Sequence, residues 1–113
     1  MKYALLIYGT IGARDALSEE DRRRIDADIS QLLARPNVSG WVRLHLVESA
    51  TTVRHEDGRT LLTDGPFVDS KEYLAGLIVV EAANLDEALT AAGEFQAARP
   101  SGAIEVRPIL DSE

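Results

Sequence analysis

The chain has no cysteine, and other features that define whole classes of protein are missing too. Without cysteine among its 113 residues, disulfide bonds and thiolate chemistry are excluded. The apolar run at residues 1–8 is too short for a signal peptide or a membrane span. No repeat, low-complexity segment or linker divides the sequence. We therefore expect a single domain over residues 1–113 that is cytoplasmic and does not associate with membranes.

Positive charge is scarce as well. Twelve Lys and Arg stand against nineteen Asp and Glu, which gives a net charge of −7. Binding to nucleic acid relies on clustered basic residues. The one basic run, residues 22–24, directly follows three acidic residues and is typical of a solvated helix face. Nucleic acid is therefore not an expected partner.

Four segments have the pattern of main β-strands. Residues 2–8 and 77–83 are apolar on both faces, which is typical of central strands buried on two sides. Residues 40–47 and 103–110 alternate, as strands at the edge of a sheet do. In addition, Asp57-Gly58 lies between two short runs and predicts a tight β-hairpin, because both turn positions require positive φ.

Two helices are expected between these strands. Ser18 is the predicted N-cap of the first helix, and Pro36 ends it near residue 34. Asn84 is the predicted N-cap of the second helix, which ends before Pro100. The apolar stripes are Ile25, Ile29, Leu32 and Leu33 in the first helix, and Leu85, Ala88, Leu89, Ala92 and Phe95 in the second.

The order of these elements is β-α-β, small hairpin, β-α-β. Without the hairpin it is the split βαβ pattern of a ferredoxin-like α+β sandwich. Two helices cover only one face of such a sheet, so apolar side chains of the central strands must point to the other face. A second copy of the chain is the expected cover for them, which predicts a homodimer.

Residues 62–76 concentrate turn residues and polar chemistry. Asp64 either fixes its own turn by accepting backbone N–H bonds or faces a cleft as a general base or ligand anchor. Gly65 supplies an unusual φ or lets a ligand approach the backbone. Lys71 is either a solvated charge or the cation that pairs with Asp64 or with an anionic ligand. Tyr73, with its apolar ring and polar tip, is a candidate to line a pocket.

Polar residues on the two edge strands provide the other candidates. His45 shares the mixed face of its strand with Arg43, and imidazole ordinarily changes charge near neutral pH, so it is an acid/base candidate or a hydrogen-bonded interface residue. Arg107 lies on the mixed face of the last strand. If both faces look into the dimer, Arg43 and Arg107 predict a small acidic ligand. Two histidines with scattered carboxylates give no metal-ligand spacing, so neither a metal nor another cofactor is expected.

Several motifs together resemble one known family. They are residues 1–9, Thr51-Thr52-Val53-Arg54, Thr63-Asp64-Gly65-Pro66-Phe67 with Lys71-Glu72 and Gly76, Leu85-Asp86-Glu87-Ala88, and Ile104-Glu105-Val106-Arg107-Pro108. The sequence resembles the YCII-related family, and specifically its Asp-Gly-Pro-Phe branch. This resemblance implies a dimeric α+β barrel with a cleft near the interface, and no agreed activity. Family members with a proposed His-Asp pair carry a His on the first helix, whereas this chain has none between Ser18 and Arg35.

Two functions remain open at this point. In the first, a small homodimeric protein binds or transforms an acidic molecule in a cleft built from Asp64, Tyr73, His45, Arg43 and Arg107. In the second, the chain is a non-catalytic regulatory or interaction module. The resemblance favours extracytoplasmic-function sigma factors as its partner, because some relatives accompany or are fused to them.

Overall fold

The computed structural model describes residues 1–110. Its elements are β1 (Lys2–Thr10), α1 (Glu19–Leu33), β2 (Val38–Arg43), the 3₁₀ turn η1 (Val47–Ser49), β3 (Thr51–Glu56), β4 (Arg59–Asp64), β5 (Glu72–Glu81), α2 (Leu85–Ala97) and β6 (Ala103–Pro108). The four main strands form one antiparallel sheet in the order β2-β5-β1-β6. This is an α+β fold with the strand order of a ferredoxin-like βαββαβ sandwich, and the two doubly apolar strands are central as predicted.

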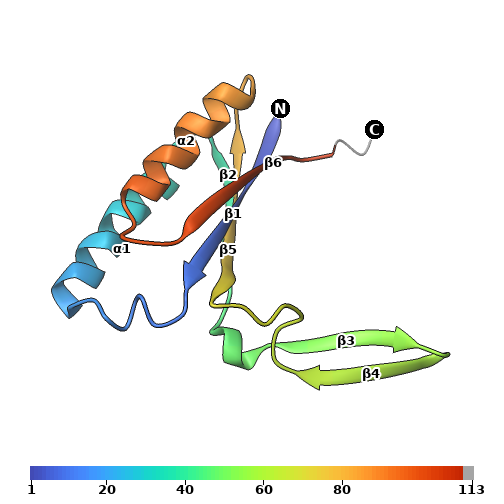
Figure 1. Cartoon of the computed structure of the whole chain (residues 1–113). Helices are drawn as coiled ribbons and strands as arrows, with labels where there is room; N and C mark the ends of the chain where they lie inside the picture. The colour runs from blue at the N-terminus through green and yellow to red at the C-terminus, as the bar shows by residue number, and fades with distance from the viewer. Residues whose placement is uncertain (111–113) are drawn as a thin grey trace.

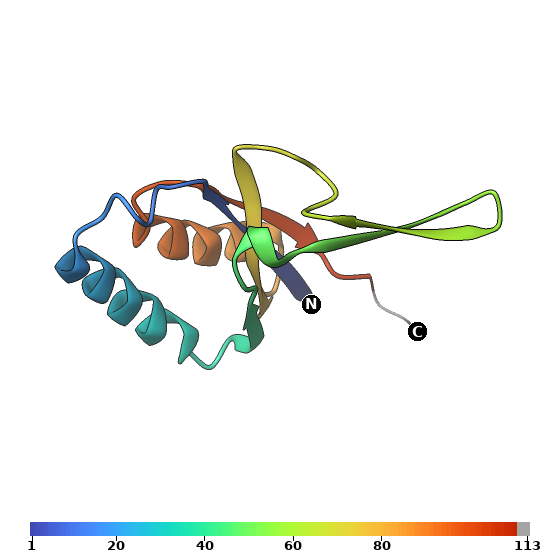
Figure 2. The same cartoon turned by 90° about the horizontal axis from the view of Figure 1, so that it is seen from below.

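Both helices lie on the same side of this sheet (Figures 1 and 2). The register determines which side chains face them. Leu5 is opposite Ile78 and Val106, and Tyr3 is opposite Val80. Tyr3, Leu5, Ile78 and Val80 are buried and form the core with Ala88, Ala92 and Phe95 of α2.

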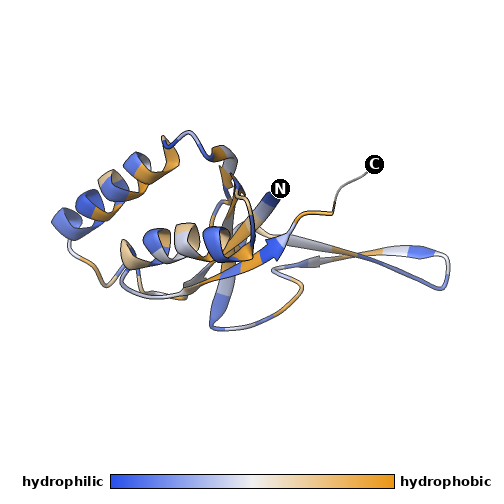
Figure 3. Ribbon diagram, turned by 90° about the horizontal axis from the view of Figure 1, so that it is seen from above, coloured by the Kyte–Doolittle hydropathy of each residue, from blue (hydrophilic) through white to orange (hydrophobic). Residues whose placement is uncertain are grey.

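The helix caps are as predicted. The Ser18 hydroxyl accepts from the Asp21 N–H at 3.0 Å, and the Asn84 side chain accepts from the Glu87 N–H at 3.0 Å. The α2 stripe was predicted wrongly in part. Leu85 and Leu89 are each 47% exposed, because the helix buries Ala88, Ala91, Ala92 and Phe95 instead. Small alanines bring α2 close to the sheet, whereas α1 has no fully buried residue. Figure 3 shows the polar and apolar residues of α1 on opposite sides of the helix.

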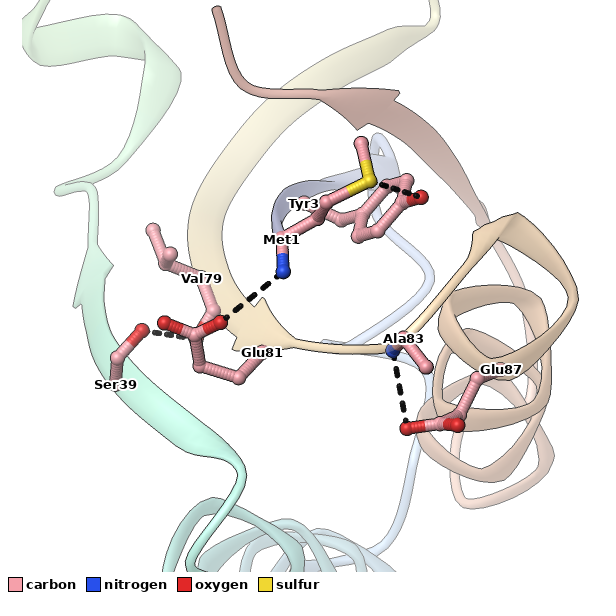
Figure 4. Close-up of polar contacts among 7 residues, drawn as sticks. All are labelled: Met1, Tyr3, Ser39, Val79, Glu81, Ala83 and Glu87. Atoms are coloured by element: carbon pink, nitrogen blue, oxygen red, sulfur yellow. Dashed lines mark hydrogen bonds and ion pairs between the residues drawn. The ribbon is translucent and has the colours of Figure 1, made fainter. Parts of the chain in front are cut away.

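Polar contacts tie the strands together at the end of the sheet where β1 begins (Figure 4). The Ser39 hydroxyl donates to the carbonyl of Val79 at 3.3 Å, across the β2–β5 pair. The Ala83 N–H donates to the Glu87 side chain at 3.3 Å, so this carboxylate reinforces the start of α2. Glu81 also lies 3.6 Å from the amino group of Met1. These contacts fix the end of the sheet that lies away from the cavity described below.

The hairpin β3–β4 projects from the opposite side of the sheet from the helices, away from the body (Figures 1 and 2). Its turn is as predicted, with φ of 50° at Asp57 and 75° at Gly58. The radius of gyration is 16.1 Å, against about 13 Å for a compact domain of this length. We call β3, β4 and the following residues 65–68 the arm. Its exposed apolar side chains include Val53, Leu62 and Phe67.

The face of the sheet opposite the helices carries apolar side chains that neither helix covers. Leu6 is opposite Leu77, and Val42 is opposite the same residue from the other neighbour. Val42 and Leu44 are 55% and 51% exposed, while Leu6 and Leu77 are half-buried. We call this surface the open face. Its existence confirms the prediction that apolar residues of the central strands point away from the helices.

Candidate functional site

A partly enclosed cavity lies between α1 and the helix side of the sheet. Its volume is about 310 Å³, at the lower end of the range for small-molecule sites. The apolar walls are Ile25, Ile29 and Leu33 of α1, Ile7 and Ile78 of the sheet, and Phe95 of α2.

Polar side chains gather at one end of this cavity because four chain segments meet there. Thr10, the last residue of β1, pairs with Glu72, the first residue of β5. The end of β2 and the loop after α2 lie at the same end of the sheet, since all neighbouring strands are antiparallel. These segments supply Arg14, Arg43, Tyr73 and Arg99 to the cavity.

Arg99 is held firmly at this end. Its guanidinium donates to the carbonyl of Tyr8 at 2.8 Å and to the Gln96 side chain at 3.0 Å, with a longer contact of 3.5 Å to the carbonyl of Ala103. Burial lowers the pKa of Arg99 from its ordinary value, and the nearby Tyr73 side chain acts in the opposite direction. The guanidinium is therefore a partly desolvated charge in a fixed position.

Arg14 has a different environment. Its guanidinium donates to both carboxylate oxygens of Asp26, at 2.8 and 3.2 Å, and this contact raises the pKa of Arg14. The pair joins the β1–α1 loop to the middle of α1. Among the described residues, Asp26 is the only acidic one in the cavity lining. Because it pairs with Arg14, no acidic side chain of the lining is left to neutralise Arg43 or Arg99.

Tyr73 lies across Gly9, its partner on β1. A Cβ placed on Gly9 would lie 2.9 Å from both Cζ and the hydroxyl oxygen of the Tyr73 ring, which is closer than such atoms can approach. The glycine therefore provides the space that the ring occupies. The ring is half-buried, and its hydroxyl group is close enough to influence the pKa of both Arg14 and Arg99.

A sequence profile of the YCII-related domain matches residues 1–113 of the chain. An uncharacterised protein of Rhizobium meliloti strain 1021, R00369, is 38% identical over 114 residues, covering 96% of this chain and 92% of that protein. The chain belongs to the YCII-related family. Among solved structures, the divalent cation tolerance protein CutA1 from Thermus thermophilus aligns with a TM-score of 0.44 at 18% identity, over 100% of this chain and 88% of that one.

Of the seven site residues predicted from the sequence, Tyr73 and Arg43 line the cavity of this YCII-related chain. Arg43 is the last residue of β2, opposite Gly76 on the helix side, and its side chain is exposed. Within residues 1–110 it makes no side-chain hydrogen bond and no ion pair. This cavity lies within one chain, between α1 and the sheet, so the cleft expected at a dimer interface stays a prediction.

Asp64 and Gly65 lie at the base of the arm, outside the cavity lining. The Gly65 N–H donates to the carbonyl of Ala50 at 2.8 Å, and the Gly65 carbonyl accepts from the Thr52 hydroxyl at 2.8 Å. With φ of 101°, Gly65 has the unusual conformation that the sequence predicted. The turn is held by these contacts, whereas the exposed Asp64 carboxylate makes no hydrogen bond to the described residues. The prediction that Asp64 fixes its own turn is therefore wrong.

The other predicted residues are dispersed. His45 follows β2, Lys71 precedes β5, and both side chains are exposed and outside the cavity lining. Arg107 lies on the open face opposite Ala4 and pairs with Glu105 at 3.0 Å. The expectation that Arg43 and Arg107 look the same way is wrong, because the register turns Arg43 toward the helices and Arg107 away from them.

Arg14, Asp26 and Arg99 were not predicted as site residues. Arg14 and Arg99 occupy loops with no recognisable motif, and only their meeting in space gives them a common role. The signal that could have identified them is topological. In a ferredoxin-like fold the loop after the first strand and the loop before the last strand lie at the same end of the sheet, so their polar residues are neighbours.

The site offers no cluster of metal ligands, and the helices are not of the membrane-spanning kind in the described part of the chain. No group of three or more His, Cys, Asp or Glu side chains in the described part of the chain is arranged to hold a metal ion. None of the helices in residues 1–110 combines the length and apolar character needed to cross a membrane.

Proposed function

We propose that this YCII-related protein binds a small acidic molecule in the cavity beneath α1. The observation that carries the proposal is the charge of the lining. Three arginines and one aspartate line the cavity, and the aspartate is paired with Arg14. The site therefore carries positive charge in a chain whose net charge is −7. Arginine is well suited to such a site, because its planar fork can bind a carboxylate through two parallel hydrogen bonds.

The proposal includes assembly as a homodimer and a cytoplasmic location. The accessible surface of the chain is 8116 Å², against about 6100 Å² expected for a compact monomer of 12.3 kDa. The excess of about 2000 Å² comfortably exceeds the roughly 800 Å² that each partner buries in a standard interface. The open face is the apolar surface that a second copy would cover. Such a dimer would be the α+β barrel expected for the Asp-Gly-Pro-Phe branch, whose motif residues 64–67 resemble.

Calorimetric titration with small carboxylates tests the binding proposal. Arg43→Gln removes one free guanidinium without breaking a contact in the described residues, and we expect it to weaken binding about tenfold, the value of a hydrogen bond to a charged group. Arg59→Gln at the exposed tip of the arm is the matched control, with no effect on affinity. Equal affinities for the two variants and the unmodified protein would contradict the proposal.

The arm supports a second candidate function, an interaction module. Val53 and Leu62 form a cross-strand pair and are 65% and 70% exposed, and Phe67 is 70% exposed. An isolated two-stranded sheet is only marginally stable in water. Following the family resemblance, the partner would be an extracytoplasmic-function sigma factor. Co-elution with such a factor in gel filtration, lost in Leu62→Ser and retained in Arg43→Gln, would favour this candidate over acid binding.

His45 and Asp64 keep a proposed acid/base role within the dimer. His45 lies in the segment that leads into the arm, and Asp64 is the last residue of β4, at the base of the arm. Gly65, Lys71 and Arg107 likewise remain proposed ligand contacts in the cleft expected near the dimer interface.

A further inference from the structure

The cavity beneath α1 has a charged end and an apolar end, and this division restricts the ligand beyond its acidity. The charged end is formed where β1 and β2 finish and β5 begins, and it holds Tyr73 and Arg99. Along α1 toward its C-terminus, the wall consists of Ile25, Ile29 and Leu33, one helical turn apart. A ligand that fills the space must meet both kinds of surface.

The apolar wall of the cavity is only partly shielded from water by the protein itself. Ile25, Ile29 and Leu33 are only half-buried, and α1 has no fully buried residue. Across the cavity, Ile78 and Phe95 are buried, whereas Trp41 is 50% exposed. An acid with no apolar part would leave this wall in contact with water, while an apolar group between α1 and the sheet would gain roughly 25 cal/mol for each Å² it removes from water.

Arg99 is the anion-binding group that suits the charged end. Three of its N–H groups donate to Tyr8, Gln96 and Ala103, and two more remain for a ligand because a guanidinium carries five. No ion pair joins Arg99 to an acidic residue in residues 1–110. A partly desolvated cation without a carboxylate partner gains more from an anion than a solvated one does. The Tyr73 hydroxyl lies over Gly9, the residue next to Tyr8, whose carbonyl accepts from Arg99, so it is a candidate second donor.

From this arrangement we propose that the ligand is an amphipathic monocarboxylic acid. Its carboxylate pairs with Arg99 and accepts from the Tyr73 hydroxyl. Its apolar body, of the size of one aromatic ring or a short branched chain, lies between Ile29 and Trp41. This inference rests on the proposed function and narrows it, since simple acids and dicarboxylic acids would satisfy the charge of the cavity equally well.

The test compares three probes on the full chain. Sodium acetate, sodium phenylacetate and disodium adipate are titrated into ¹⁵N-labelled protein, with the Trp41 indole and the Arg99 Nε–H followed by nuclear magnetic resonance. We expect phenylacetate to bind at least tenfold more tightly than acetate or adipate, because about 1.4 kcal/mol of apolar burial is enough for that ratio. Both side-chain signals should shift with phenylacetate.

Two variants locate the carboxylate. Tyr73→Phe keeps the ring over Gly9 and removes only the hydroxyl, so phenylacetate binding should weaken about tenfold without loss of folding. Tyr8→Phe removes the same atom from the open face and should change nothing. Arg99→Gln should abolish measurable binding, with circular dichroism confirming that the fold persists. Arg99→Gln also breaks the contact with the Tyr8 carbonyl and so could prevent folding. If it does, the Tyr73→Phe result alone decides where the carboxylate binds.

The outcomes separate this inference from the proposed function. Acetate or adipate binding as tightly as phenylacetate, with an effect of Arg43→Gln, would overturn the amphipathic ligand and leave acid binding intact. Phenylacetate binding that is unchanged in Tyr73→Phe would also overturn the inference. If no probe binds and Arg43→Gln has no effect on any of them, both proposals fail together.

Discussion

At the scale of single residues, the contact between Gly9 and Tyr73 determines the shape of the charged end of the cavity. The ring can lie over β1 only because its cross-strand partner has no side chain. Large residues beside glycine in a neighbouring strand often fill the space that glycine leaves. The same contact also places the Tyr73 hydroxyl in the cavity that the arginines line. The absence of a side chain at Gly9 therefore serves both the packing of the strands and the proposed binding site.

Gly9→Ala should therefore destabilise the protein and weaken ligand binding together. The new Cβ would displace the Tyr73 ring, and overpacking of this kind costs about 1–3 kcal/mol. Urea unfolding measures the first effect and calorimetry the second. Gly40→Ala is the matched control, because a Cβ at Gly40 of β2 meets nothing within 4 Å. Similar stability losses in the two variants would show that the Tyr73 contact is not responsible.

At the scale of elements, α1 is attached more weakly to the body than α2, which buries four residues. Helix α1 buries no residue completely, and two ion pairs with partly exposed side chains, Arg14–Asp26 and Arg35–Glu94, connect it to the β1–α1 loop and to α2. Such pairs stabilise by about 1 kcal/mol or less. The order of α1 therefore depends strongly on local features, above all on its N-cap.

Ser18→Ala should loosen α1 without affecting the sheet. Loss of the hydroxyl that accepts from the Asp21 N–H costs about 0.5–2 kcal/mol. Amide hydrogen exchange should become faster in residues 19–33 and stay unchanged in β1 and β5. Ser30→Ala, a serine-to-alanine change inside the same helix, should slow exchange slightly, since alanine is the better helix former. Uniform acceleration through the whole chain after Ser18→Ala would indicate that α1 does not unfold separately.

Sequence patterns predict these elements far better than they predict the cavity. Both N-caps and the Asp57-Gly58 turn each depend on a few neighbouring residues and were predicted correctly. The two central strands were also identified, although β5 begins at Glu72 rather than at residue 77 and ends at Glu81. Edge strand β2 ends at Arg43 rather than at residue 47, because the chain leaves the sheet there toward the arm. Arg14 and Arg99 are separated by most of the sequence, and only the β1–β6 register brings their loops together. No local pattern contains that information.

At the scale of the whole molecule, the flat shape and the open face determine the expected assembly. The chain measures 46 × 45 × 18 Å and leaves one side of its sheet uncovered. Joining two open faces would bury Leu6, Leu77 and Val42 from each copy. Each side chain transferred fully from water contributes about 1.5–3 kcal/mol. An unmodified dimer should have a mass of about 25 kDa by light scattering, twice the 12.3 kDa of one chain.

Val42→Glu should convert this dimer into monomers, because it places a charge in the proposed interface. The residue is 55% exposed in the single chain, so the change should not prevent folding. Leu85→Glu makes the same kind of change at a 47% exposed position on α2 and should leave the dimer intact. A mass near that of one chain for the unmodified protein at micromolar concentration would refute the dimer and, with it, the barrel.

Trp41 is an intrinsic fluorescence probe of the cavity. It is the only tryptophan in the sequence, and its half-exposed indole lies at the cavity. Intrinsic fluorescence excited at the red edge of the absorption band therefore comes from this one position. A bound acid that excludes water from the indole would shift the emission to shorter wavelength, so occupancy can be followed in the unlabelled protein and in crude mixtures of candidate compounds.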